Sequence, residues 1–121
     1  MTKITSYKEL MVWQKSYTLT KAIYKATEDF PKKEDFSLTS QMRRSSLSIP
    51  SNIAEGYRRG HKREFVQFLH IALGSASELE TQIMLAHDIG YIHEADYSSI
   101  SCTLTEILKM LTVMLRKMKQ P

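Results

Sequence analysis

The 121-residue sequence contains a single cysteine, Cys102, so no disulfide can form within the chain. This excludes the small secreted domains whose folds depend on several disulfides, and it favours a reducing, cytoplasmic location. Only four glycines and three prolines are present, which is too few for the many turns of an all-β fold. The scarcity of both residues therefore favours an all-α protein.

Long apolar runs are also missing. No uninterrupted stretch of apolar residues is long enough to span a bilayer, and the first nine residues lack the apolar core of a signal peptide. We therefore expect neither a membrane partner nor export. The length suits one domain over residues 1–121. The formal net charge of +4 permits attraction to nucleic acid without requiring it.

Motifs that carry catalysis or bind metals are absent as well. The sequence has no Gly-x-Ser-x-Gly, phosphate-binding loop or dinucleotide fingerprint, and Cys102 has no base close to it in sequence. His61 and Glu64 form one His-x-x-Glu pair, and the other three histidines stand in no di-iron register with acidic residues. We therefore expect a protein that is not an enzyme and holds no metal or cofactor.

Apolar residues at helical spacing predict a first helix from about Tyr7 to Asp29. Its stripe is centred on Leu10, Trp13, Tyr17 and Tyr24. Four further residues widen the stripe: Val12, Leu19, Ile23 and Ala26. We interpret Trp13 as an anchor in the core. Pro31 and the charged residues after it end this helix.

A second helix is predicted to begin near Ser37 or Thr39 and to contain Pro50. Proline removes a backbone donor and collides with the carbonyl four residues earlier, at a cost of roughly 3 kcal/mol in an ordinary helix. We therefore expect a kink, or a break into two shorter helices. The nearby serines are interpreted as bonding the carbonyls that proline frees, rather than as nucleophiles or phosphorylation sites: Ser45, Ser46, Ser48 and Ser51.

Two further helices show heptad spacing. The third predicted seam comprises Phe65, Leu69, Ala72, Ala76, Leu79, Ile83 and Ala86. The fourth helix, from about Ala95 to Lys117, has its seam at Tyr97, Ile100, Leu104, Ile107, Leu111, Met114 and Met118. Small residues at 74–77 indicate close approach of a neighbouring helix or of another subunit. Short connections predict an all-α, antiparallel up-down four-helix bundle with long helices, the second kinked at Pro50.

The segment between the second and third helices concentrates positive charge. It holds Arg58, Arg59, Lys62 and Arg63, and Gly56 and Gly60 can supply the positive φ that closes the turn. One helix earlier stand two more cations, Arg43 and Arg44. Six cations could contact phosphates, and each phosphate neutralised would strengthen binding at low salt.

A solvated surface with local ion pairs, such as Glu55 with Arg59, is the alternative interpretation of the same charges. Tyr57 is the only aromatic residue beside the arginines in sequence, so contacts to the backbone or to the shape of a nucleic acid are favoured over stacking on bases.

Several separated motifs carry a resemblance to a known family. They are Tyr7-Lys8-Glu9-Leu10, Val12-Trp13-Gln14, Gln41-Met42-Arg43-Arg44-Ser45, Ser48-Ile49-Pro50-Ser51-Asn52-Ile53-Ala54-Glu55-Gly56, Glu64-Phe65, Phe68-Leu69, Gly74-Ser75 and Glu78-Leu79-Glu80-Thr81-Gln82. Over about Tyr7 to Ile92 the sequence resembles the bacterial 23S ribosomal RNA intervening-sequence proteins. The last helix matches that family mainly in its pattern.

The resemblance implies an antiparallel four-helix bundle that assembles into a ring-like homopentamer. It also implies a relationship to the accessory protein of diversity-generating retroelements, which is positively charged and binds nucleic acid and a reverse transcriptase. Arg43, Arg44, Arg58 and Arg59 fall within or beside the matching motifs. We therefore expect a non-enzymatic, oligomeric, cytoplasmic bundle that binds structured RNA or other nucleic acid. A protein-interaction scaffold without direct nucleic-acid binding is the alternative.

Overall fold

The computed structural model describes residues 3–120, which form four long helices and three short 3-10 turns. The long helices are α1 (Met11–Ala26), α2 (Leu38–Arg58), α3 (Lys62–Asp88) and α4 (Glu94–Met118). The short turns are η1 (Tyr7–Glu9), η2 (Thr27–Asp29) and η3 (Lys32–Glu34). No strand occurs within residues 3–120, and the predicted all-α four-helix bundle is confirmed.

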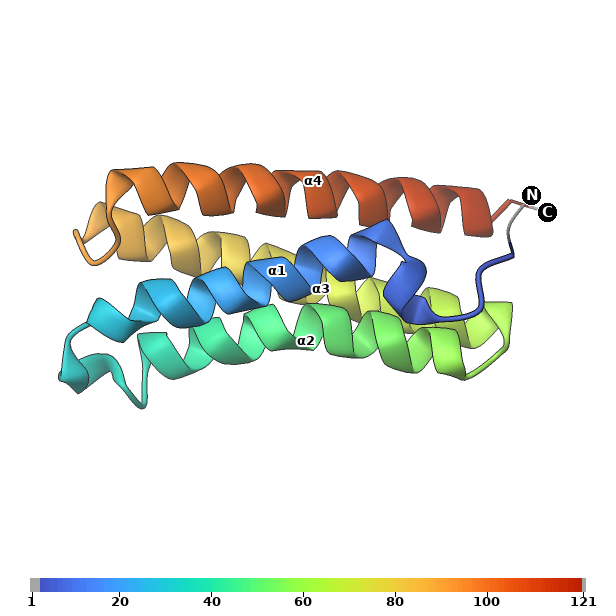
Figure 1. Cartoon of the computed structure of the whole chain (residues 1–121), viewed down its shortest axis with the longest axis horizontal. Helices are drawn as coiled ribbons and strands as arrows, with labels where there is room; N and C mark the ends of the chain where they lie inside the picture. Colours follow the sequence, from blue (N-terminus) through green and yellow to red (C-terminus); the bar gives the residue numbers. More distant parts are fainter. Residues whose placement is uncertain (1–2, 121) are drawn as a thin grey trace.

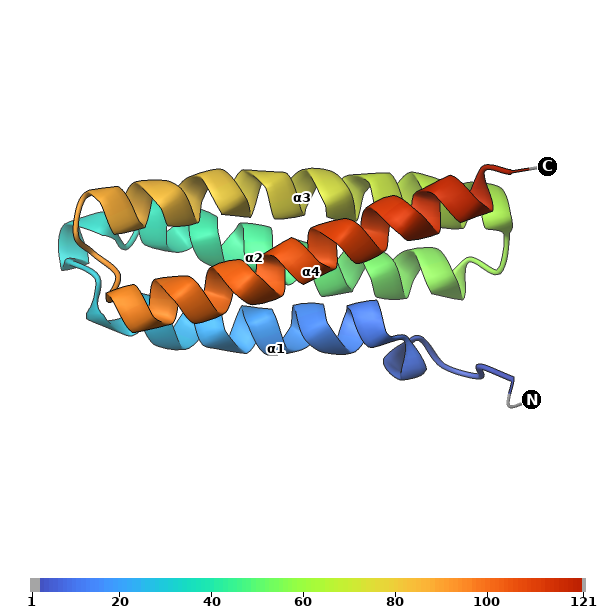
Figure 2. The ribbon, with the colours of Figure 1, turned by 90° about the horizontal axis from the view of Figure 1, so that it is seen from above.

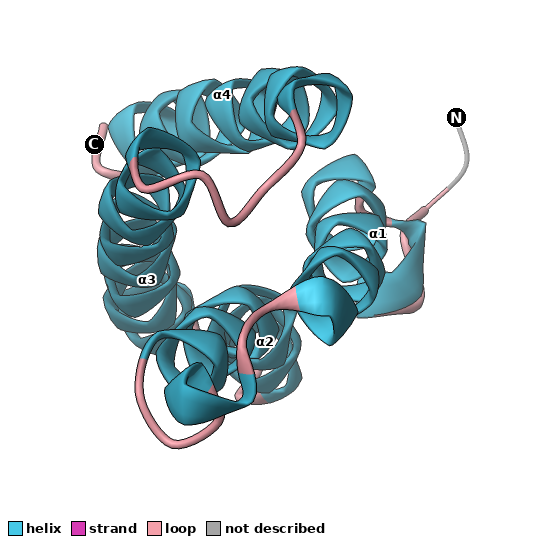
Figure 3. Cartoon of the chain, turned by 90° about the vertical axis from the view of Figure 1, so that its left-hand side faces the viewer, coloured by secondary structure: helices cyan, strands magenta, loops and turns pink. Residues whose placement is uncertain are grey.

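Each helix packs against the next one, and α1 also packs against α4, so that the four helices enclose one core (Figure 3). Successive helices run in opposite directions along the bundle (Figures 1 and 2). The α2–α3 turn, the C-terminal end of α4 and the segment before α1 consequently lie at one end of the molecule. The α1–α2 and α3–α4 connections lie at the other end.

The core follows the heptad seams of the last two helices closely. On α3 the seam is buried from Leu69 to Ala86, and Phe65 is half-buried at its start. On α4 the residues Ile100, Leu104, Ile107, Leu111 and Leu115 are buried, and the methionines at the C-terminal end are half-buried against them. Both seams therefore lie where the spacing of apolar residues places them.

The first helix turns a different face to the core. Its most deeply buried apolar residues are Val12, Leu19 and Ile23. Trp13 is half-buried, whereas Tyr17 is 46% exposed and Tyr24 is 42% exposed. The prediction that Tyr17 and Tyr24 belong to the core-facing stripe is therefore wrong, whereas Trp13 is partly buried and packs against the core. The polar residues Ser16 and Thr20 are buried instead. The Ser16 hydroxyl donates to the carbonyl of Trp13, whereas the Thr20 hydroxyl lies 2.9 Å from the carbonyls of both Ser16 and Ser46 and shares its one proton between them.

The second helix is continuous through Pro50, so the predicted break into two shorter helices is wrong, while the kink stays a prediction. Ser46 donates to the carbonyl of Arg43 at 2.9 Å, and the Ser45 hydroxyl lies 2.9 Å from the carbonyl of Gln41 and 2.7 Å from a carboxylate oxygen of Glu78. Pro50 frees neither of these carbonyls, so the prediction that the serines bond the freed carbonyls is wrong for Ser45 and Ser46. The carbonyl that the proline frees, that of Ser46, accepts from Thr20 on α1 at 2.9 Å. The partner of that carbonyl thus comes from a neighbouring helix.

The small residues at 74–77 allow a close approach between α2 and α3. Ala76 is fully buried, and the Ser75 hydroxyl lies 2.8 Å from that of Ser48 on α2. Gly74 takes no part in this close approach, because a Cβ built on it would meet nothing within 4 Å. Of the two alternatives drawn from the sequence, the neighbouring helix of the same chain accounts for Ser75 and Ala76.

Among residues 3–120, α4 alone is long and apolar enough to cross a membrane by length and composition. A core helix of a bundle meets the same two criteria, and α4 packs its apolar side against α1 and α3. The expectation from the sequence required an uninterrupted apolar run, and the sequence contains none. Helix α4 has no such run, because its polar residues are spread along one face of the helix, but its average composition is apolar enough.

Candidate functional site

Four of the predicted binding residues lie together at the α2–α3 turn. Arg58 is the last residue of α2 and Arg59 is its C-cap, whereas Lys62 and Arg63 begin α3. All four side chains are exposed. Gly60 closes the turn with a φ of 77°, a conformation that other residues rarely adopt. The chain reversal therefore holds four cations at the ends of two packed helices.

Gly56 has a different role from the one that the sequence suggested. It lies inside α2, and a Cβ built on it would come within 2.6 Å of the Cβ of Phe68. The absence of a side chain lets α2 and α3 approach each other just before the turn. Gly56 thus fixes the packing of the two helices, and only Gly60 supplies a positive φ at this turn.

Two other segments bring further cations to the same end of the bundle. Lys62 donates from Nζ to the carbonyl of Gln120 at 3.4 Å, and Tyr57 donates from its hydroxyl to the carbonyl of Ile4 at 3.2 Å. We call residues 3–9, 55–64 and 116–120 the basic end; they include nine basic and three acidic residues. The additional cations are Lys3, Lys8, Arg116, Lys117 and Lys119.

The opposite end carries the opposite charge. Residues 28–35 and 87–96, which we call the acidic end, include seven acidic residues and two lysines. The two connections that contain them lie at the same end of the molecule (Figures 1 and 2), where the Tyr91 hydroxyl of one donates to Glu34 of the other at 3.0 Å. Charge is therefore segregated along the long axis of the molecule, so a polyanion is attracted to one end far more strongly than the net charge suggests.

Few of these cations are neutralised by the protein itself. The predicted ion pair between Glu55 and Arg59 is confirmed, with 2.8 Å between Oε2 and Nη2. This hydrogen bond raises the pKa of Arg59 above its ordinary value, so the guanidinium stays charged. Arg58, Lys62 and Arg63 form no ion pair in the part of the chain that the structure describes. Their charge is available to a ligand.

Aromatic rings surround the turn more closely than the sequence indicated. The Arg58 guanidinium lies 5.5 Å from the centre of the Tyr7 ring, and that of Arg59 lies 5.1 Å from the centre of the Phe68 ring. The interpretation that Tyr57 is the only aromatic partner is therefore wrong in space, because Tyr7 and Phe68 come from other segments.

The Tyr57 ring in turn meets Phe65 edge to face, with 6.1 Å between ring centres. A cavity of about 460 Å³ opens beside these rings, lined by Gly56, Tyr57, Gly60, His61, Lys62, Phe65 and Met118. The basic end thus combines exposed cations with aromatic and apolar side chains.

Arg43 and Arg44 lie elsewhere on α2, fifteen and fourteen residues before Arg58, which corresponds to about 21–22 Å of helix. Arg44 is exposed. Arg43 is half-buried and donates from Nε to Thr27 at 2.8 Å and from Nη2 to the carbonyl of Tyr24 at 3.3 Å. The structure therefore does not bring these two arginines to the turn, and Arg43 also holds α2 against the end of α1.

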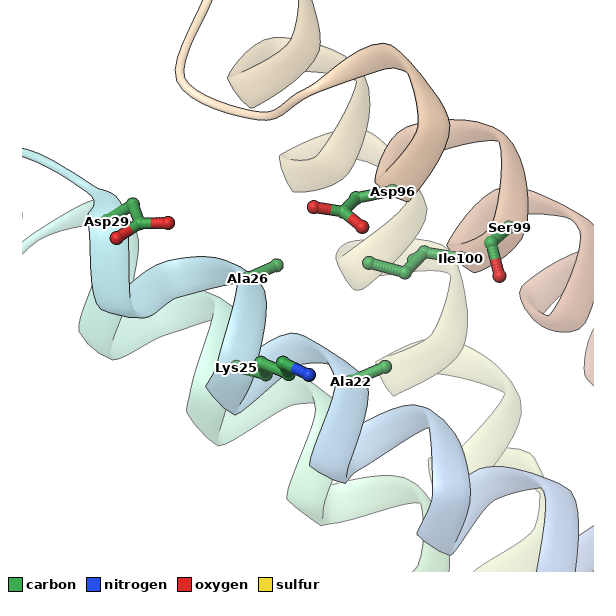
Figure 4. Close-up of a pocket in the computed structure, with 7 residues that line it drawn as sticks. All are labelled: Ala22, Lys25, Ala26, Asp29, Asp96, Ser99 and Ile100. Carbon is green, nitrogen blue, oxygen red and sulfur yellow. The ribbon is translucent and has the colours of Figure 1, made fainter.

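A second hollow lies between α1 and α4 near the acidic end (Figure 4). It has a volume of about 210 Å³, with Asp29 and Asp96 on opposite sides and Lys25 below them. Within residues 3–120 no group of three or more histidine, cysteine or acidic side chains could hold a metal ion.

Comparison with known proteins places these features in a family. Residues 8–113 match the model of the 23S rRNA-intervening sequence proteins. Among solved structures, the chain is similar to a protein of unknown function from the S23 ribosomal protein family of Bacteroides thetaiotaomicron VPI-5482. The two are 31% identical with a TM-score of 0.77, over 87% of this chain and 98% of the other. No curated protein matches the sequence.

Proposed function

Because the chain belongs to the family of 23S rRNA-intervening sequence proteins, we propose that it is a non-enzymatic, oligomeric bundle that binds structured RNA or another nucleic acid. Binding takes place through phosphate contacts at the basic end. The observation that carries this proposal is the segregation of charge, with nine basic residues against three acidic ones at that end. Three of the four cations at the turn form no ion pair within residues 3–120.

Helix geometry supports an anion site at this position. The first turn of α3, which contains Lys62 and Arg63, has backbone N–H groups and the positive end of the helix dipole directed at the same region. Arginine adds a planar fork of donors that suits phosphate oxygens. The turn therefore offers both charge and hydrogen-bond donors to a phosphate backbone.

The test is fluorescence anisotropy of nuclease-treated protein with labelled structured RNA and duplex DNA across a salt series. The variant that tests the site replaces Arg58, Arg59, Lys62 and Arg63 by alanine. We expect binding to weaken for every sequence and the salt slope to fall by about 0.7 to 0.9 for each phosphate that the variant no longer neutralises. A labelled unrelated polyanion shows how much of the binding needs only charge.

The matched control replaces the exposed Lys32 and Lys33 by glutamate, because two changes from lysine to glutamate alter the net charge as much as four changes from a cation to alanine. This variant undergoes the same change in net charge, but its substitutions lie outside the basic end. We expect its affinity and salt slope to stay close to those of the wild type. Equal weakening in the two variants would show that net charge, rather than the basic end, controls binding.

Exposed apolar side chains support the oligomeric part of the proposal. Ile71 and Leu85 on α3 and Ile89 at its C-cap are each about half exposed although they are large and apolar. Covering such residues in a complex with other copies removes apolar surface from water. Analytical ultracentrifugation over a range of concentrations tests this part, and a monomer at every concentration would contradict it.

The same apolar residues favour a second candidate, a scaffold that recruits a protein partner without binding nucleic acid. A partner held by apolar contacts stays bound at high salt and after nuclease treatment, whereas phosphate contacts weaken under the first condition and disappear under the second. Retention of a partner under both conditions, together with no binding of RNA or DNA at low salt, would favour this candidate.

A further inference from the structure

Four aromatic side chains follow one another along η1 and α1, and we call Tyr7, Trp13, Tyr17 and Tyr24 the aromatic row. The rings of Trp13 and Tyr17 stack with 5.0 Å between centres and 12° between planes. Tyr7 meets Trp13 edge to face at 5.2 Å. The row is accessible, since Tyr17 and Tyr24 are nearly half exposed. The deeply buried apolar residues of α1 are Val12, Leu19 and Ile23, and of the row Trp13 also packs against the core.

Each of three rings in the row has a cation over it. Arg58 lies over Tyr7 at 5.5 Å, Lys21 lies over Tyr17 at 5.1 Å, and Arg43 lies over Tyr24 at 4.8 Å. Two of these cations come from α2, so the row borders that helix. Helix α1 contains three lysines and no acidic residue, and one of these lysines, Lys15, pairs with Glu106 of α4. Helix α2 contains one acidic residue, which pairs with Arg59. The row therefore lies in a strip of positive charge.

We propose that the aromatic row binds a single-stranded segment of nucleic acid, with bases stacked on the rings and phosphates on the neighbouring cations. A stacked base contributes roughly 1–3 kcal/mol whatever its identity, because every base has a π-face. This inference rests on the proposed function and names the form of nucleic acid that it binds.

The exposed cations beside the row can exchange their contact with a ring for a contact with a phosphate. Lys21 and Arg58 are exposed and form no ion pair within residues 3–120. Each can leave its ring for a phosphate oxygen and thereby open the ring face to a base. Arg43 is held by its hydrogen bonds to Thr27 and Tyr24 and presents its charge at a fixed position. The row therefore has two exposed cations beside it, Lys21 and Arg58, and one cation, Arg43, that hydrogen bonds hold in place.

The row is also continuous with the basic end. From Trp13 to Tyr24 it covers eleven residues, or about 17 Å of helix, which is long enough for a few nucleotides. At its other end Tyr7 lies under Arg58, which belongs to the basic end. A strand whose phosphates contact the basic end can therefore continue along α1 without a gap in positive charge.

The chain provides its own reporter for this test, because Trp13 is its only tryptophan. Tryptophan emission is recorded while the protein is titrated with oligouridine, with oligothymidine, with a duplex RNA of the same length and with heparin. We expect the single strands to quench emission in parallel with binding. Heparin and duplex RNA bind the basic end by charge and leave the emission nearly unchanged.

Substitutions on the exposed part of the row supply the second measurement. Tyr17→Leu and Tyr24→Leu should each weaken the binding of oligouridine roughly five- to 150-fold. Tyr17→Phe, which keeps the ring, should bind like the wild type. The matched control is Phe36→Leu, which removes a fully exposed ring near the acidic end and should have no effect.

The two proposals fail in different ways. If oligouridine binds through the basic end but the tryptophan emission and the Tyr17→Leu affinity do not change, the inference about the row is wrong and the phosphate contacts stand. If Tyr17→Leu changes the oligomeric state and not the affinity, the row is a contact between copies of the chain, which also overturns the inference. If no nucleic acid binds even at low salt, both proposals are wrong.

Discussion

Thr20 on α1 donates a hydrogen bond from its hydroxyl to the carbonyl of Ser46 on α2, over 2.9 Å. In an unbroken α-helix that carbonyl would accept from the backbone N–H of residue 50, which proline lacks. Thr20 and Ser46 are both buried, so water cannot replace the missing donor. The side chain of one helix thus satisfies the acceptor that proline exposes in its neighbour, and it joins α1 to α2.

Thr20→Val should lower the free energy of unfolding by about 1–3 kcal/mol, because it keeps the shape of the side chain but leaves the Ser46 carbonyl without a partner. The measurement is urea unfolding monitored by circular dichroism. In a Pro50→Ala background, residue 50 regains its N–H, and the cost of Thr20→Val should fall markedly. The same cost in both backgrounds would show that the Ser46 carbonyl is not the cause.

Alanine should have opposite effects at the two glycines inside α2 and α3. At Gly56 the new Cβ meets Phe68 at 2.6 Å, so Gly56→Ala should destabilise the fold by about 1–3 kcal/mol. At Gly74 a Cβ meets nothing within 4 Å, so Gly74→Ala should stabilise the helix by about 0.5–1 kcal/mol. Urea unfolding of both variants checks the pair. Stabilisation by Gly56→Ala would mean that α2 and α3 separate without cost.

The heptad helices could be predicted from sequence because apolar residues recur at alternating spacings of four and three along each of them. On α3 this spacing runs from Phe65 to Ala86 and the burial follows it, although Ile71 and Leu85 lie outside the seam and stay half exposed. Helix α1 offers two overlapping faces about 120° apart, one centred on Val12 and one on the aromatic residues. The spacing of apolar residues could not decide which face is buried. Ser16 and Thr20 lie on the buried face, but serine and threonine are usually exposed and therefore did not indicate it.

The candidate site was predictable only where it is local in sequence. The four cations at the α2–α3 turn occur within six residues, so their cluster is visible in the chain itself. The ring under Arg58 belongs to Tyr7, about fifty residues earlier, and that contact depends on the packing of η1 beside α2. The cations of α4 reach the same end because the helices alternate in direction, which no local motif records.

Glu55→Gln should strengthen the binding of nucleic acid at the basic end. In the wild type the carboxylate of Glu55 holds the guanidinium of Arg59 at 2.8 Å and competes with phosphate for it. The amide removes that competing charge, and an exposed ion pair of this kind contributes under about 1 kcal/mol to folding. We expect affinity to rise a few-fold and the salt slope to steepen by up to about one, measured by anisotropy.

Glu106→Gln provides the matched control, since Glu106 pairs with Lys15 away from the basic end. It makes the same change in net charge and should alter binding less than Glu55→Gln does. Equal increases in affinity from both variants would assign the effect to overall charge rather than to the release of Arg59.

The hydroxyl of Tyr91 donates to Glu34 at 3.0 Å, and this hydrogen bond raises the pKa of the phenol above its ordinary value of 10.0. The folded state therefore favours the neutral phenol more than the unfolded state does. The resulting stabilisation is complete below about pH 10 and is lost as the pH rises through the folded-state pKa. Unfolding by urea at about pH 9 and about pH 11 should show a larger loss of stability for the wild type than for Tyr91→Phe.

Tyr91→Phe keeps the ring that contacts Phe30, with 5.4 Å between ring centres, so packing is preserved while the titrating group is removed. Tyr17→Phe is the control, because it removes an exposed phenol that has no hydrogen bond within residues 3–120. That variant should lose as much stability between the two pH values as the wild type does. If Tyr91→Phe behaves in the same way as Tyr17→Phe, the alkaline loss comes from other groups, such as the lysines, and not from the contact between Tyr91 and Glu34.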